Sequence, residues 1–149
     1  MLPRTETLSD GDIDAFLVAA SQVEALHDAA LTPHKGAELV LVKTVNVGHP
    51  VESAVQEAAQ YWPILDACRP VVSYLAAREP VAYSVVAWRL WRSPPLPWRE
   101  VAERAGLSSH SAAMEAMHRA RYVVRMMVPP GTARAVVRWV RRKAEERVS

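Results

Sequence analysis

The chain has 149 residues, of which 50% are hydrophobic and 23% are charged. This composition is typical of a folded globular protein and excludes an intrinsically disordered tail. The net charge of +2 hides a strong asymmetry: residues 1–79 contain five basic and eleven acidic residues (net −6), and residues 80–149 contain thirteen basic and five acidic residues (net +8). We therefore expect an acidic lobe over 1–79 for protein interaction or oligomerisation, and a basic lobe over 80–149 that meets a polyanion.

The same sequence predicts a cytoplasmic protein without a membrane partner. No apolar run approaches the roughly 18 residues that a membrane-spanning helix needs. The first residues lack the hydrophobic stretch of a secretory signal, so none is expected. A single cysteine, Cys68, excludes an intrachain disulfide framework and suits the reducing cytosol.

The first predicted element is an amphipathic helix over 11–31. Ser9 and Asp10 are good N-cap residues, and Asp12 and Asp14 add negative charge near the positive end of the helix dipole. Apolar residues then recur at helical spacing: Ile13, Phe16, Leu17, Ala20, Val23, Leu26 and Ala30.

The aspartates of this helix also imitate the start of a calcium-binding EF-hand loop. Asp10, Asp12 and Asp14 occupy its first three ligand positions. However, the sixth position holds Ala15 instead of glycine, and the twelfth holds Ser21 instead of glutamate. Helix capping therefore explains the aspartates better than calcium does.

Residues 37–47 are ambiguous. Four valines and a threonine favour a strand, but the sequence contains no obvious second strand to pair with it. A short helix within an all-α fold is the preferred prediction for this segment.

Prolines divide the middle of the chain. Proline is well tolerated in the first turn of a helix and poorly tolerated in its interior. The prolines predict a helix opened by Pro50, helices near 63–69, near 70–78 and over 80–92, and a rigid linker at 93–97.

The segment that follows has the pattern of a helix-turn-helix. A short helix over 97–105 precedes Gly106, which allows the positive φ that a tight turn needs. Leu107 is expected to fill the angle between the helices. Ser108 or Ser109 is expected to cap a second helix over about 109–127.

Trp98-Arg-Glu-Val-Ala-Glu-Arg-Ala-Gly-Leu-Ser108, followed by His118-Arg-Ala-Arg121, resembles the fourth region of bacterial sigma factors. The same module recurs in small phage late-gene activators and antiterminators. The resemblance covers about residues 78–127 and implies a tri-helical module that binds double-stranded DNA. It also implies RNA polymerase or a sigma factor as a further partner.

In such a module the N-terminal part of the second helix faces the bases of the major groove. The expected base contacts are Ser109, His110, Ser111, Met114 and His118. The expected phosphate contacts within the module are Arg99, Arg104, Arg121 and Arg125. The five expected base contacts include no arginine, so none of them can make the bidentate contact that reads guanine, and we expect modest sequence specificity.

A basic amphipathic helix is predicted after Pro129-Pro130-Gly131, with Thr132 as its cap. Its apolar stripe comprises Ala133, Val136, Val137, Val140 and Ala144. Its other side carries Arg134, Arg138, Arg141, Arg142 and Lys143. A solvated helix face explains this pattern as well, but the clustering of its acids at the end favours an arm that contacts phosphates.

No catalytic, cofactor or metal site is expected. His110 and His118 are eight residues apart, about 12 Å along a helix, too far to share one metal ion. No phosphate-binding loop, nucleophile elbow or carboxylate pair is recognisable.

The prediction is an all-α multi-helix protein with a C-terminal tri-helical helix-turn-helix module and a basic terminal helix. The favoured function is a DNA-binding transcription regulator that is not an enzyme, of the phage-encoded kind. One alternative is a phage small terminase subunit, which would form homo-oligomeric rings. Another is a protein-interaction domain that keeps the helix-turn-helix only as a scaffold.

Overall fold

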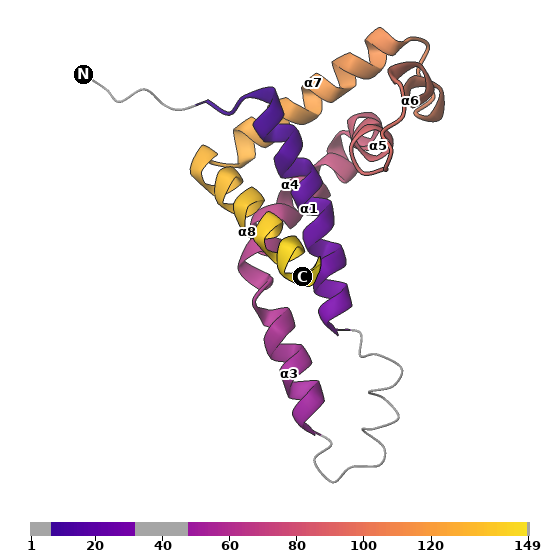
Figure 1. The fold of residues 1–149 in the computed structure, drawn as a ribbon. Helices are drawn as coiled ribbons and strands as arrows, with labels where there is room; N and C mark the ends of the chain where they lie inside the picture. Colours follow the sequence, from indigo (N-terminus) through magenta and orange to yellow (C-terminus); the bar gives the residue numbers. More distant parts are fainter. Residues whose placement is uncertain (1–6, 32–47, 149) are drawn as a thin grey trace, which may run out of the picture.

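The computed structural model describes residues 7–31 and 48–148, and every regular element within these ranges is an α-helix (Figure 1). The all-α multi-helix fold is therefore confirmed for the described residues. The segment 37–47 lies outside them, so its structure stays a prediction. The helices are α1 (Asp10–Leu31), α3 (Gly48–Ala59), α4 (Trp62–Arg78), α5 (Pro80–Arg89), α6 (Trp98–Arg104), α7 (His110–Met127) and α8 (Pro130–Val148).

Helix α1 begins with a reciprocal cap. The Ser9 hydroxyl accepts a hydrogen bond from the backbone N–H of Asp12 at 3.1 Å, and the Asp12 carboxylate accepts one from the N–H of Ser9 at 3.4 Å. This pairing satisfies two N–H groups that the helix itself leaves without partners. The predicted apolar stripe is confirmed, because Ile13, Phe16 and Leu17 are fully buried.

Helix α4 is continuous, and the prediction of two helices near 63–69 and 70–78 is wrong. Pro70 lies inside α4 with its side chain exposed. The buried residues Leu65 and Cys68 before it, and Val71 and Leu75 after it, form one stripe along the helix. Burial of this stripe outweighs the missing hydrogen bond at the proline.

Several helix ends also differ from the prediction, and helix α3 begins at Gly48 instead of at Pro50. Helix α5 ends at Arg89 instead of residue 92, where the chain turns towards α1 and the Trp91 indole donates a hydrogen bond of 2.8 Å to the backbone oxygen of Leu17. Helix α8 begins at Pro130 instead of after Thr132. A proline in the first turn loses no helical hydrogen bond, which explains the earlier start.

The helices form a body with a projecting arm (Figure 1). Helices α1 and α8 lie side by side and run in the same direction, with α4 packed against both. Helix α7 crosses near the N-terminal end of α1 and extends away from the body, and α5 and α6 pack against its far part. The N-terminus of α7 is thus at the tip of this arm (Figure 1).

One continuous buried core joins the acidic and basic halves of the chain. It contains Phe16 and Leu75 from residues 1–79 together with Val85, Val124 and Val140 from residues 80–149. The expected division at residue 80 is therefore no boundary in the packing of the described residues, although it remains a prediction about function.

Candidate nucleic-acid interface

The turn between α6 and α7 is built around Gly106, whose φ is +73°. The N–H of Gly106 donates to the oxygen of Glu103 at 3.2 Å, and the N–H of Leu107 donates to the oxygen of Ala102 at 2.8 Å. This pair of bonds is a Schellman motif, in which a left-handed residue closes the end of a helix. The predicted positive φ at Gly106 is confirmed.

Helix α7 starts at a side-chain cap. The Ser109 hydroxyl accepts a hydrogen bond from the N–H of Ala112 at 3.2 Å, so Ser109 and not Ser108 is the cap. The cap and the Schellman motif together fix the direction in which α7 leaves α6.

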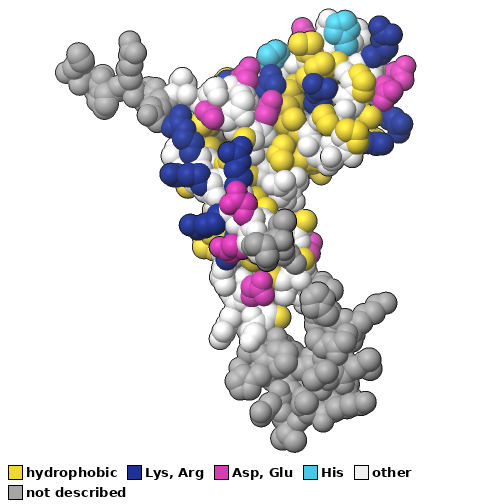
Figure 2. All heavy atoms as spheres, in the orientation of Figure 1, with side chains coloured by type: hydrophobic (Ala, Val, Ile, Leu, Met, Phe, Trp, Pro, Cys, Tyr) yellow, Lys and Arg dark blue, Asp and Glu magenta, His cyan; other side chains and the backbone are white. Residues whose placement is uncertain are grey.

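The two faces of α7 differ in composition. The buried face is made of small and apolar residues that pack against α5 and α6, namely Ala113, Ala116, Met117 and Ala120. All five predicted base contacts are exposed: Ser109, His110, Ser111, Met114 and His118. The structure therefore gathers the predicted base-contacting residues near the tip of the arm, where Figure 2 shows histidines beside basic side chains.

Two of the predicted phosphate contacts belong to α6, where Arg99 and Arg104 are exposed. The Arg104 guanidinium lies 5.1 Å from the ring centre of Trp88. The Arg92 guanidinium lies 5.7 Å from the same ring. Trp88 thus holds two cations close together by cation–π attraction. The sequence prediction missed Arg92 because it lies on a different element from Arg104, and only tertiary packing brings both to one tryptophan.

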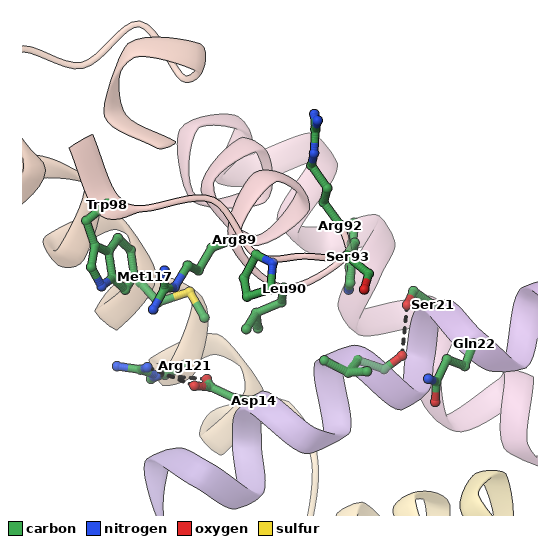
Figure 3. Close-up of a pocket in the computed structure, with 13 residues that line it drawn as sticks. Asp14, Ser21, Gln22, Arg89, Leu90, Arg92, Ser93, Trp98, Met117 and Arg121 are labelled. Atoms are coloured by element: carbon green, nitrogen blue, oxygen red, sulfur yellow. Dashed lines mark hydrogen bonds and ion pairs between the residues drawn. The ribbon is translucent and has the colours of Figure 1, made fainter. Parts of the chain in front are cut away.

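Arg121 is bound within the chain. Its Nε and Nη2 atoms donate to the two carboxylate oxygens of Asp14, each at 2.9 Å (Figure 3). Its side chain is 15% exposed, and the hydrogen bonds from its guanidinium to Asp14 raise the pKa of Arg121. A guanidinium held in this way is not open to a DNA phosphate.

The other two arginines of α7 are also ion-paired. The Nη2 atom of Arg125 lies 2.6 Å from an Asp10 carboxylate oxygen, and this hydrogen bond lowers the pKa of Asp10. Arg119 lies 3.6 Å from the Glu79 carboxylate. Asp14 and Asp10 therefore compensate the charges of Arg121 and Arg125, the two arginines of α7 that the sequence predicts as phosphate contacts.

The basic residues of α8 form a separate group, visible as dark blue side chains along the flank of the body in Figure 2. Arg138, Arg141 and Arg142 are exposed. Arg134 lies 4.0 Å from Asp12, and Lys143 donates to the Gln60 side chain at 3.0 Å. The 18 residues of α7 separate this group from the tip by about 27 Å.

A cavity of about 580 Å³ lies between α1, the linker before α6, and α7 (Figure 3). Its polar wall includes Arg89, Arg121 and Asp14. The Arg89 side chain donates to the Leu96 oxygen at 2.7 Å and stacks 4.6 Å from the ring centre of Trp98. The main role of Arg89 is structural, because its two contacts hold the linker between α5 and α6 in place.

The residues that could bind a metal ion are not grouped in the described part of the chain. No cluster of three or more His, Cys, Asp or Glu residues there could hold a metal ion. Cys68 is buried, and burial raises the pKa of its thiol to about 12, so it is a core residue and no thiolate nucleophile at neutral pH. No helix in these ranges is long and apolar enough to cross a membrane.

Comparison with known proteins finds no matching family model, no matching curated protein and no matching solved structure.

Proposed function

We propose that the chain is a double-stranded DNA-binding protein whose α6–turn–α7 unit (residues 98–127) acts as a helix-turn-helix. The observation that supports this proposal is the exposed face at the start of α7. That face presents hydroxyl, imidazole and thioether groups at the tip of the arm, and such groups can contact base edges in the major groove. The resemblance to sigma region four favours a cytoplasmic transcription regulator that also contacts RNA polymerase or a sigma factor. The proposal assigns no catalytic role or cofactor.

The charges near α7 set the expected strength of this binding. Residues 98–118 contain two arginines, Arg99 and Arg104, and three glutamates, Glu100, Glu103 and Glu115, so this segment has a net charge of −1. Each neutralised phosphate contributes about −0.9 to the slope of log K against log salt. Binding through Arg99 and Arg104 alone therefore gives a slope of about −2. Participation of Arg138, Arg141 and Arg142 would make it about −4.5.

The test is fluorescence anisotropy with random-sequence duplex DNA at several salt concentrations. Arg104→Ala should weaken binding and reduce the steepness of the slope by about 0.9. Arg78→Ala is the matched control, because Arg78 is the exposed arginine in the last turn of α4 just as Arg104 is in that of α6. Absence of duplex binding at low salt, or equal effects of the two substitutions, contradicts the proposal.

The internal ion pairs of α7 favour a second candidate, the protein-interaction domain. Arg119, Arg121 and Arg125 all pair with carboxylates of the chain, and Glu115 stands on the exposed face. Recovery of RNA polymerase or a sigma factor in a pull-down, without DNA affinity at physiological salt, selects this candidate. A ring of many subunits in light scattering selects the terminase alternative.

A further inference from the structure

A groove follows the line along which α1 and α8 lie side by side. Its first part has a volume of about 340 Å³ and begins beside Gly11. Its second part has a volume of about 460 Å³ and reaches Gln22. Ala15, Val137 and Arg141 line both parts, so the groove is continuous.

The length of the groove matches about three turns of a helix. Its walls run from Gly11 to Gln22 on α1 and from Arg134 to Glu145 on α8. At a rise of 1.5 Å per residue, each wall is about 17 Å long, or about three helical turns. Helices α1 and α8 run in the same direction (Figure 1), so both walls of the groove run from their N-terminal to their C-terminal residues along it.

Small apolar side chains line much of the groove. Ala15 and Val18 of α1, and Val137 and Ala144 of α8, are half-buried. A partner that covers these side chains removes apolar area from water, which is favourable.

The charge of the groove is positive in its middle. Arg138 and Arg141 are exposed, and neither has an ion-pair partner among residues 7–31 and 48–146. The acidic residues stand at the two ends, with Asp12 4.0 Å from Arg134 at the beginning and Glu145 at the far end. A complementary partner therefore carries its negative charge near its centre.

We propose that the α1/α8 groove binds an acidic amphipathic helix of another protein. The apolar side of that helix covers Ala15, Val18 and Val137, and its central carboxylates meet Arg138 and Arg141. Amphipathic helices commonly bind grooves in this way. The apolar floor distinguishes the groove from a surface for DNA phosphates. This proposal does not depend on DNA binding by the α6–turn–α7 unit.

The test uses the full chain and a fluorescently labelled designed peptide. The peptide is a 16-residue helix with leucines along one face and glutamates in its central turns, and a scrambled peptide of the same composition is its control. Arg141→Glu should weaken binding about tenfold or more, since an attraction becomes a repulsion. Arg142→Glu makes the same charge change on the adjacent residue, which does not line the groove, and should have little effect.

A second variant tests the apolar contact. Ala15→Phe fills the groove without a change in charge and should also weaken peptide binding about tenfold, while circular dichroism checks that the chain stays folded.

Equal losses from Arg141→Glu and Arg142→Glu, or no preference for the acidic peptide over its scrambled control, overturn the proposal. Displacement of the peptide by duplex DNA, with equal dependence on Arg141 and Arg142, assigns α8 to phosphates instead. DNA binding that depends on Arg104 is measured separately, so the two proposals can fail independently.

Discussion

At the scale of single residues, the contacts that an arginine makes within the chain determine whether its charge is free to bind another molecule. Arg121 and Arg104 are both arginines of the α6–turn–α7 unit. Arg121 is held by two hydrogen bonds to Asp14, whereas Arg104 lies exposed over the ring of Trp88. The sequence spacing treats them alike, but only Arg104 retains a guanidinium that can meet a partner.

Gly106→Ala should lower the free energy of unfolding by about 1–2 kcal/mol. The cause is backbone strain, because L-residues pay this cost at positive φ, and an added Cβ meets no atom within 4 Å. Gly131→Ala is the control, since its Cβ also meets nothing within 4 Å but Gly131 lies in ordinary helical backbone at the start of α8. It should be neutral or stabilising by about 0.4–1 kcal/mol. Urea unfolding measures both, and equal effects would falsify the strain argument.

Glu24 should make stability depend on pH. Arg69 donates hydrogen bonds of 2.7 and 3.1 Å to its carboxylate, and these lower the pKa of Glu24 below its ordinary 4.5. The folded state therefore favours the charged form, so the stabilisation is complete above pH 4.5 and is lost as the pH falls through the lowered pKa. Because both side chains are about half exposed, the contribution is about 0.2–1 kcal/mol.

Urea unfolding at pH 7 and at pH 3 tests this dependence. Glu24→Gln should reduce the stability difference between the two pH values. Glu115→Gln should not, because Glu115 is exposed on α7 and forms no ion pair within the described part of the chain. An unchanged difference in the Glu24 variant would show that the Arg69 pair contributes nothing.

At the scale of elements, burial of a continuous stripe overrides local propensity. Helix α4 continues through Pro70 because Leu65, Cys68, Val71 and Leu75 all enter the same core. Helix α5 ends early for a related reason, since Trp91 packs onto the core and reaches the Leu17 backbone. Tertiary contacts thus set helix boundaries that proline positions alone predict incorrectly.

Pro70→Ala should raise the free energy of unfolding by about 1–3 kcal/mol. Alanine restores the backbone N–H and removes the clash that proline makes inside a helix. The Pro70 side chain is exposed, so its loss leaves no cavity. Pro63→Ala is the comparison, because Pro63 lies in the first turn of α4, where proline is tolerated. Thermal unfolding that ranks the two variants equally would contradict this explanation.

At the scale of the whole molecule, the acidic and basic halves are folding partners. Helix α1 packs along α8 and across α7, and its aspartates pair with arginines of both helices. The charge asymmetry therefore serves ion pairs between α1 and the helices α7 and α8. We assign Arg99 and Arg104 of α6 to DNA, and Arg138 and Arg141 of the α1/α8 groove to an acidic helix, because these four form no ion pair within the described part of the chain.

Residues 80–149 should not fold cooperatively by themselves. Without α1 and α4, the core loses Phe16, Leu17, Leu65 and Leu75, all nearly or fully buried in the whole chain. We expect helical far-ultraviolet circular dichroism with weak near-ultraviolet signals, and recovery of the near-ultraviolet signal when residues 1–79 are added. A cooperative melting transition of the isolated fragment contradicts the shared core.

The sequence by itself determined the helical class, the apolar stripe of α1, the positive φ at Gly106 and the start of α7. Each depends on short-range physics, namely periodicity, capping and steric freedom. Only the tertiary structure decided the continuity of α4, the pairing of Arg121 with Asp14, the meeting of Arg92 and Arg104 at Trp88, and the α1/α8 groove. Asp14 and Arg121 are 107 residues apart, and no local pattern encodes a contact that depends on how the whole core packs.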